Sequence, residues 1–223
     1  MFVWIGAAVF VASLAYFLFS YLVTFDASEA SGTEWGSITW NVGLFTLFAL
    51  HHSIFARERV RAWIARHVPP MLERSVYVWV ASVLFIAVCA LWSPVPGVVW
   101  EAHGGVLWTL RLLQVAGIWL SLRSAALLDV RQLAGIRAVN SSHVEFRTRG
   151  PYGWVRHPIY SGWFLLVCAA SLMTMTRFVF AAVSCAYLLV AIPFEERSMR
   201  TASRDGYEQY ARQVPWRLLP GVY

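Results

Sequence analysis

The fold class of this chain is decided by residues 2–24, which read FVWIGAAVFVASLAYFLFSYLVT and contain no Asp, Glu, Lys, Arg or His. At a rise of 1.5 Å per residue, a helix of this length crosses a hydrocarbon core about 30 Å thick. The run is too long for the apolar part of a cleaved signal peptide, and no basic residue precedes it. We therefore expect a first transmembrane helix that is retained in the protein.

The composition of the whole chain is that of a membrane protein. Of its 223 residues, 59% are hydrophobic and only 13% are charged, which argues against a water-soluble globule. Lys is absent, and 18 Arg against 12 acidic residues give a net charge of +6. This excess is too dispersed, in too apolar a chain, to predict a nucleic-acid partner. Cys89, Cys168 and Cys185 lie in apolar stretches without metal-ligand spacing, so we predict no metal site.

Five further apolar segments follow, each bounded by charges, prolines or glycines. They span about residues 38–55, 76–92, 106–128, 159–176 and 178–194. Only Arg177 separates the last two, and each is close to the minimum spanning length, so we expect a tight helical hairpin. The predicted fold is an all-α integral membrane protein with about six transmembrane segments. We divide it into a four-helix region, 1–130, and a region, 131–223, that contains a loop, the hairpin and a C-terminal helical tail.

The distribution of arginine predicts the orientation of these segments. Cytoplasmic loops retain Arg, whereas translocated loops tend to lack it. The loop after the first segment contains Asp26, Glu29 and Glu34 without Arg, and the loop at 94–105 contains only Glu101. The other two loops contain Arg57, Arg59, Arg61, Arg66, Arg74, Arg131, Arg137, Arg147, Arg149 and Arg156. We therefore expect an integral protein of a bacterial inner membrane, with both termini in the cytoplasm.

The densest run of residues suited to a ligand site lies at 150–162 and reads GPYGWVRHPIYSG. Pro158 suits the first turn of a helix, whose uncapped N–H groups could receive an anion, so Arg156 and His157 would lie at its mouth. Tyr160 would offer an aromatic face and a hydroxyl, and Gly162 would let a ligand or a neighbouring backbone approach closely. Each residue alone could be an interfacial anchor, but the joint pattern favours a site.

Two glutamates, Glu195 and Glu196, stand at the end of the last apolar segment, where an unpaired carboxylate is expensive. In one interpretation Glu196 pairs with Arg200 across a helical turn and Glu195 is solvated. In the other, the hairpin returns both glutamates to the surface that holds Arg156 and His157. The second arrangement would form one cytoplasmic pocket, suited to S-adenosylmethionine but equally to other zwitterions or nucleotides.

Several spaced elements resemble the C-terminal signature of the isoprenylcysteine carboxyl methyltransferase superfamily. They are RHPIYSG at 156–162, EER at 195–197, YEQY at 207–210, VP at 214–215 and Pro220. The resemblance implies an integral membrane methyltransferase that binds S-adenosylmethionine on its cytoplasmic side. With the argument above, it predicts a cofactor site of Arg156, His157, Pro158, Tyr160, Gly162, Glu195, Glu196, Tyr207 and Tyr210. One departure is the sequence SRDG at 203–206, where the family often has Phe-Gly before the first tyrosine.

The N-terminal half resembles the methanethiol S-methyltransferase branch, which is also similar to NnrU-type membrane proteins. The similar elements are HHSIFAR at 51–57, VPP at 68–70, ERSVYV at 73–78, PGVVW at 96–100 and LAGIR at 133–137. This resemblance implies that the substrate is a small thiol such as methanethiol and that the product is dimethyl sulfide.

Methyl transfer from a sulfonium is an in-line displacement, and a thiol acceptor must react as its thiolate. His51 and His52, near the expected cytoplasmic end of the second segment, are candidates for the base or thiolate stabiliser. Arg123 is a candidate cation and ranks above Arg111, which lies nearer the outer end of its segment. Adjacent residues on a helix point about 100° apart, so at most one histidine faces a given pocket. Alternatively, one histidine bonds a backbone carbonyl between helices and the other lies at the interface.

Other functions remain open at this point. A lipophilic methyl acceptor, such as a prenylcysteine carboxylate or a phospholipid amine, would fit the same enzyme class if the protein opens toward membrane lipid. A non-enzymatic NnrU-like membrane factor or a small transporter would keep the fold without turnover. The joint presence of the RHPxY segment and the glutamate pair favours the enzyme.

Overall fold

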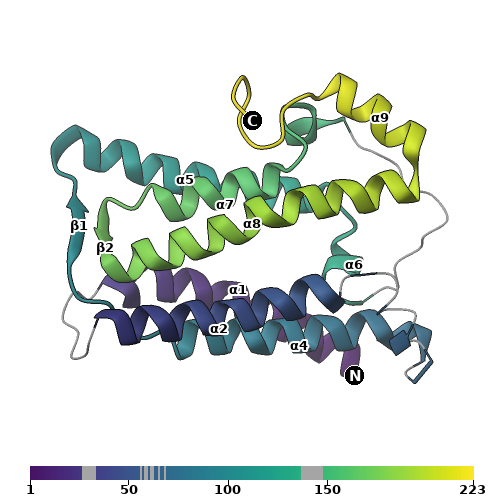
Figure 1. Cartoon of the computed structure of the whole chain (residues 1–223), viewed down its shortest axis with the longest axis horizontal. Coiled ribbons are helices and arrows are strands. Elements are labelled where there is room, and N and C mark those ends of the chain that lie inside the picture. The colour runs from purple at the N-terminus through teal and green to yellow at the C-terminus, as the bar shows by residue number, and fades with distance from the viewer. Residues whose placement is uncertain are drawn as a thin grey trace. The chain divides into compact units, whose positions relative to one another are not determined.

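The computed structural model describes residues 1–26, 34–55, 57, 60, 63–64, 66–67, 69–136 and 148–223. Among the residues used above, Glu29, Ala56, Arg59, Arg61, Val68, Arg137 and Arg147 lie outside this set. The described chain is mostly helical (Figure 1). It divides into two compact units. Unit 1 comprises Met1–Glu101, Asp129–Val139 and Leu172–Val183, and unit 2 comprises Ala102–Leu128, Asn140–Ser171 and Ser184–Tyr223.

Both units are built mainly from helices. Unit 1 contains α1 (Phe2–Leu22), η1 (Thr24–Asp26), α2 (Glu34–Phe55), α4 (Pro70–Ala90), β1 (Val98–Glu101), α6 (Val130–Leu133) and β2 (Leu172–Thr174). Unit 2 contains α5 (Gly104–Ala126), η2 (Gly150–Gly153), α7 (Pro158–Cys168) and α9 (Arg204–Gln213). The long helix α8 (Met175–Ala202) begins in unit 1 and continues into unit 2.

The core of unit 1 is aromatic, and α1 and α2 both pack against α4. The Phe180 ring is completely buried, with ring centroids 5.5 Å from Phe17 and 5.7 Å from both Tyr21 and Phe25. Tilted and stacked aromatic pairs at these distances add to the energy of apolar burial. Phe180 therefore ties the first turns of α8 to α1 and η1.

Four described helices are long and apolar enough to cross a membrane: Phe2–Asp26, Leu72–Ala90, Gly104–Ala126 and Met175–Ala202. They correspond to the first, third, fourth and sixth predicted segments. Helix α2, the second predicted segment, is 22 residues long but more polar, with Asn41, His51 and His52 on it. Helix α7, in the fifth predicted segment, has only 11 residues, which is too short to span.

The predicted hairpin is wrong in its boundaries, and the all-α prediction misses one sheet. Helix α7 ends at Cys168, and residues 172–174 form β2, which pairs antiparallel with β1. Thr174 joins β2 to η1, because its hydroxyl donates a 2.6 Å hydrogen bond to the carbonyl of Phe25. The second arm is longer than predicted because α8 runs without a break through Arg177 to Ala202.

Arg177 can lie within α8 because its guanidinium is paired with acceptors at and just after the end of α1. Its guanidinium contacts Asp26 Oδ1 at 2.7 Å and donates to the carbonyl oxygens of Tyr21, Leu22 and Leu172 at 2.7–2.9 Å. A charged side chain in an apolar helix is tolerated when it is paired in this way. Arg177 therefore anchors the helix and does not mark a turn.

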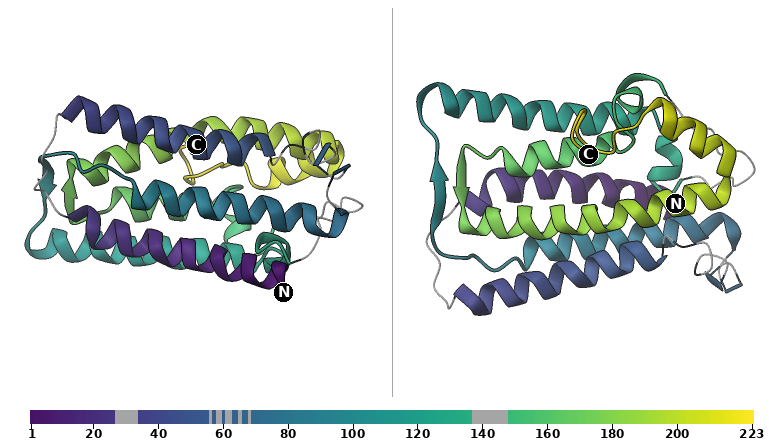
Figure 2. Two further views of the ribbon diagram at one scale, coloured as in Figure 1. Left: turned by 90° about the horizontal axis from the view of Figure 1, so that it is seen from below. Right: turned by 45° about the horizontal axis from the view of Figure 1, so that its top comes forward.

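In unit 2, α5 runs alongside α7 (Figure 2), and glycines bring the two backbones into contact. A Cβ atom at Gly162 would lie 2.6 Å from the Gly117 carbonyl oxygen and 2.8 Å from the Ser121 nitrogen. Gln114 of α5 also donates a 3.0 Å hydrogen bond to the Leu166 carbonyl. Of the two uses left open for Gly162, close approach of a neighbouring backbone is the one observed. A contact between Gly162 and a cofactor stays a prediction.

Candidate cofactor site in unit 2

The residues before α7 are held by the C-terminal segment, which we define as residues 214–223. The backbone N–H groups of Arg156 and His157 donate to the carbonyl oxygens of Trp216 and Arg217, each at 2.9 Å. Within the first turn of α7, the Tyr160 and Ser161 N–H groups both donate to the His157 carbonyl at 3.0 Å. Pro158 occupies the first helical position, as predicted. These four N–H groups have protein acceptors and are not open to an anion. Binding of an anion elsewhere at the start of α7 stays a prediction.

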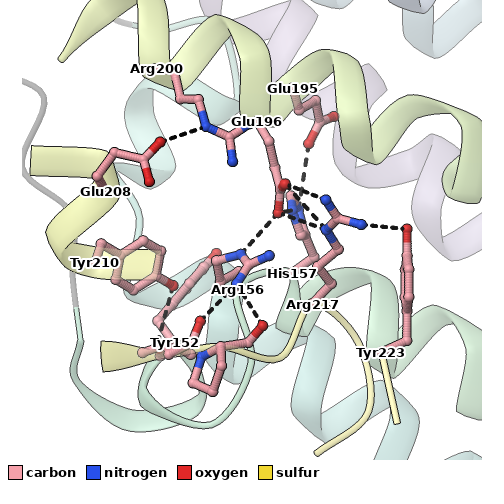
Figure 3. Close-up of polar contacts among 12 residues, drawn as sticks. Tyr152, Arg156, His157, Glu195, Glu196, Arg200, Glu208, Tyr210, Arg217 and Tyr223 are labelled. Carbon is pink, nitrogen blue, oxygen red and sulfur yellow. Dashed lines mark hydrogen bonds and ion pairs between the residues drawn. The ribbon is translucent and has the colours of Figure 1, made fainter. Parts of the chain in front are cut away.

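A completely buried carboxylate, Glu196, is the centre of the polar network (Figure 3). Arg156 Nε donates to Glu196 Oε1 at 2.9 Å, and His157 Nε2 lies 3.5 Å from the same oxygen. Arg217 contacts both carboxylate oxygens, with Nη2 3.0 Å from Oε2 and Nε 3.2 Å from each. Two guanidinium groups therefore compensate this buried carboxylate, the condition under which a buried ion pair is tolerated.

The sequence interpretation that paired Glu196 with Arg200 is wrong. Arg200 Nε instead contacts Glu208 Oε1 of α9 at 2.9 Å, and both side chains are 43% exposed. The other interpretation, in which the glutamates lie beside Arg156 and His157, matches these distances. It holds although the hairpin boundaries differ, because α8 extends far enough to bring its glutamates level with the start of α7.

Glu195 has different surroundings from its neighbour. Its side chain is 45% exposed, against 0% for Glu196. Its carboxylate accepts a hydrogen bond from the Tyr160 hydroxyl and lies 3.7 Å from His157 Nδ1. The His157 and Tyr160 rings stack, with centroids 5.5 Å apart and an interplanar angle of 11°. His157 thus contacts both carboxylates, and Glu195 with Tyr160 forms the accessible part of the network.

The two tyrosines of α9 are packed into the unit. Tyr207 is completely buried, and the Tyr210 hydroxyl donates a 3.1 Å hydrogen bond to the Tyr152 carbonyl. Burial and the nearby charge of Glu196 raise the pKa of Tyr207 to about 12, and burial raises the pKa of Tyr210 to about 12. Both phenols therefore stay neutral near pH 7. Their predicted contact with a cofactor stays a prediction.

Sequence reasoning missed Arg217. Its Nη1 donates to the Tyr223 hydroxyl at 3.1 Å, and hydrogen bonds to Glu196 raise the pKa of Arg217. The available signal was a single charged residue in the apolar stretch VPWRLLPGVY at 214–223. A lone Arg among apolar residues indicates a buried partner, but nothing in the sequence identifies Glu196 as that partner.

The predicted catalytic residues lie on other elements. In unit 1, the Tyr77 hydroxyl of α4 is 2.9 Å from His52 Nδ1 and donates to the His52 carbonyl at 3.3 Å. His51 stacks on Phe55, with ring centroids 4.5 Å apart. Arg123 is exposed in the last turn of α5, in unit 2. Tyr77 was not predicted, and its roles as a polar partner and as a packing residue cannot be told apart from sequence alone.

The accessible groups of the unit 2 network define the kind of ligand it can bind. Glu195 offers an acceptor for hydroxyls or for a positive centre, and stacked rings lie beside it. The Arg217 side chain is 31% exposed and can meet an anion. The network therefore suits a polar ligand with a cationic centre, hydroxyls and a carboxylate.

Comparison with known proteins shows which family the chain resembles in the region that carries Arg156, His157 and the two glutamates. Residues 106–201 match the profile of the isoprenylcysteine carboxyl methyltransferase family. The chain is 36% identical to a methanethiol S-methyltransferase of Crocosphaera subtropica over 82% of its own length and 74% of that protein. It is 32% identical to methanethiol S-methyltransferase 2 of Bradyrhizobium diazoefficiens, over 98% and 88% respectively.

A shorter similarity, 35% identity over 46% of the chain and 41% of the relative, is to Nurim of Homo sapiens. No solved structure matches the chain significantly. The similarity to the two methanethiol S-methyltransferases thus extends well beyond the region of the family profile, and for the Bradyrhizobium protein it covers nearly the whole chain, including the helices of unit 1.

Proposed function

Because this chain belongs to the isoprenylcysteine carboxyl methyltransferase family, we propose that it S-methylates a small thiol, converting methanethiol to dimethyl sulfide. The observation that carries this proposal is the similarity to methanethiol S-methyltransferases over most of the chain. For one of them it covers 98% of the chain and so includes the N-terminal helices. The region covered by the family profile begins only at residue 106. The N-terminal similarity therefore supports the choice of acceptor, and the profile supports the methyltransferase class.

Methyltransferases of this family use S-adenosylmethionine, and the unit 2 network fits that cofactor. Glu195 and Tyr160 would hold its hydroxyls or its ammonium group. When bound, the cofactor supplies an electrophilic methyl group on a positively charged sulfur. The buried pairs around Glu196 fix the neighbouring side chains before binding, which lowers the entropic cost of association.

We assign the handling of the acceptor thiol to His51, His52 and Arg123. A thiol must lose its proton to become an effective nucleophile, and a neutral imidazole can accept that proton. The contact between Tyr77 and His52 Nδ1 supports this assignment, because the partner of one ring nitrogen determines the proton state of the other. Arg123 would favour the thiolate through its positive charge.

We also propose six membrane segments, which are the four long apolar helices, α2 and the fifth predicted segment that begins with α7, and a methyltransferase core within residues 131–223. The arginine distribution supports cytoplasmic termini in a bacterial inner membrane, surrounded by membrane lipid. Green fluorescent protein fused after Tyr223 should fluoresce, and alkaline phosphatase fused there should be inactive. An active phosphatase fusion would contradict this orientation.

The choice of acceptor is tested by competition. The purified protein receives S-adenosylmethionine labelled in its methyl group, together with equal concentrations of methanethiol, a farnesylated cysteine and phosphatidylethanolamine. We expect the label in the headspace as dimethyl sulfide. Label in the farnesyl ester or in the methylated phospholipid would contradict the thiol assignment and keep the enzyme class. No transfer to any acceptor by protein that binds the cofactor would favour a non-enzymatic membrane factor.

A further inference from the structure

Glu196 connects three segments that are distant in the sequence. It is carried by α8, Arg156 reaches it from the residues before α7, and Arg217 reaches it from the C-terminal segment. Arg217 makes three of these nitrogen to oxygen contacts, at 3.0–3.2 Å. A planar guanidinium that contacts both oxygens of a carboxylate fixes orientation as well as distance.

The backbone of the C-terminal segment is bound by residues that lie within or just before α7. Arg156 Nη1 donates to the carbonyl oxygens of Val214 and Pro215 at 2.9 and 2.7 Å. The Ser161 hydroxyl donates to the Leu218 carbonyl at 2.7 Å, beside the two backbone hydrogen bonds to Trp216 and Arg217. The backbone before and after Arg217 is therefore hydrogen-bonded to residues within or next to α7. The Arg217 side chain then joins this segment to Glu196 of α8.

The effect of Arg217 extends to the accessible groups through His157. The His157 ring lies 3.5 Å from Glu196 on one side and 3.7 Å from Glu195 on the other, and it stacks on Tyr160. Loss of Arg217 would leave part of the Glu196 carboxylate without its donors, and a buried acceptor without donors is costly. The carboxylate would then turn toward its remaining donors, His157 among them, and the ring would move relative to Glu195 and Tyr160.

From these contacts we propose that Arg217 is a positioning residue of the cofactor site, which acts through Glu196 to fix His157 against Glu195 and Tyr160. The inference rests on the proposed role of these three residues in holding S-adenosylmethionine. It assigns a function to the C-terminal segment, which closes the network from outside the helical hairpin. Arg217 need not touch the cofactor to exert this effect.

The test measures S-adenosylmethionine binding by calorimetry, and kcat and KM for the cofactor, in full-length protein in detergent. Arg217→Ala should raise the Kd and KM for the cofactor by about tenfold or more, since the loss of one hydrogen bond to a charged group has an effect of this size. The kcat at saturating cofactor should change much less. Arg217→Lys keeps the charge without the planar fork, so it should recover part of the affinity.

Arg212→Ala is the matched control, because Arg212 is an exposed arginine in the last turn of the adjacent helix α9. It removes the same charge a few residues away and should leave the Kd within about twofold, as expected of a surface substitution. Thermal unfolding of each variant measures whether the fold is intact. If Arg217→Ala does not fold, Arg217→Lys carries the test. Its Kd for S-adenosylmethionine should then be higher than that of the wild type, although it keeps measurable binding.

A double-mutant cycle with Glu196→Gln separates positioning from direct contact with the cofactor. If Arg217 acts through Glu196, the double variant should lose little more affinity than the weaker-binding single variant. Losses that multiply would overturn the inference and make Arg217 an independent ligand of the cofactor. Wild-type affinity in both Arg217 variants would overturn it outright. Absence of binding by the wild-type protein would instead contradict the proposed cofactor site as a whole.

Discussion

Adjacent glutamates with opposite surroundings are the central feature at the scale of single residues. Consecutive side chains on a helix point about 100° apart, so α8 directs Glu196 into a buried cluster of cations and leaves Glu195 at the accessible edge. The network therefore separates two tasks. Glu196 holds the structure of the site together, and Glu195 is free to take part in binding a ligand.

This division of tasks predicts different effects for the same substitution at the two positions. Glu196→Gln leaves the buried Arg156 guanidinium and the part-exposed Arg217 guanidinium without a counter-charge and should destabilise the protein by about 3 kcal/mol or more. Glu195→Gln removes a part-exposed charge and should leave the unfolding temperature nearly unchanged while it weakens binding of S-adenosylmethionine. Thermal unfolding and calorimetric titration of both variants measure the difference. Equal destabilisation by the two substitutions would contradict the division.

A second prediction at this scale concerns Tyr77 and His52. Tyr77→Phe removes the hydroxyl that contacts His52 Nδ1 and the His52 carbonyl but retains the ring. If His52 handles the thiol proton, Tyr77→Phe and His52→Ala should both lower kcat and leave the Kd for S-adenosylmethionine unchanged. Steady-state kinetics with methanethiol, beside cofactor titration, provides the measurement. Normal kcat in both variants would remove His52 from the acceptor site.

The residue types of the unit 2 network could be predicted from sequence, but their pairing could not. Arg156, His157 and Glu196 stand out because ionisable residues beside apolar segments need partners. Arg217 was missed because its partner lies 21 residues away and on a different element. The hydrogen bonds from the Arg156 and His157 amides to the C-terminal segment were missed for a related reason, since that segment carries no recognisable signal in the sequence.

At the scale of elements, the contact between α5 and α7 depends on two glycines. Any side chain at Gly162 would meet the backbone of α5 at distances well below van der Waals contact. The packing of these two helices therefore sets where α7 begins, and with it the position of His157. Gly43 of α2 is different, because nothing lies within 4 Å of the place where its Cβ would be.

This contrast gives a matched pair of substitutions in helices. Gly162→Ala should destabilise the protein by about 1–3 kcal/mol, because overpacking forces the backbones apart. Gly43→Ala adds the same methyl group in open space and should be neutral or stabilising by up to about 1 kcal/mol, from helix propensity alone. Thermal unfolding in one detergent compares the two. A tolerated Gly162→Ala would show that α5 and α7 are not in close contact.

Sequence patterns located the helices better than the connections between them. Apolar runs identified α1, α4 and α5 to within several residues. Strand β2 was missed because its three residues, Leu172–Thr174, continue an apolar run, and periodicity cannot distinguish a short strand from a helix there. Arg177 was taken for the hairpin turn because the sequence does not reveal its pairing with Asp26.

At the scale of the whole molecule, composition alone decides the membrane class, and loop charges support an orientation. The division into two units could not be read from the sequence, because each unit combines three separate stretches of chain. All the residues of the polar network around Glu196 belong to unit 2, whereas His51, His52 and Tyr77 belong to unit 1. We therefore predict that cofactor binding is a property of unit 2.

Hydrogen–deuterium exchange with and without S-adenosylhomocysteine tests that prediction most directly. Bound ligand slows exchange where it orders or covers the backbone. We expect protection in peptides that cover residues 154–162, 193–200 and 214–223, with α1 and α4 unchanged, and we expect Glu195→Gln to reduce this protection. Protection confined to unit 1, with these three peptides unchanged at saturating ligand, would contradict the account.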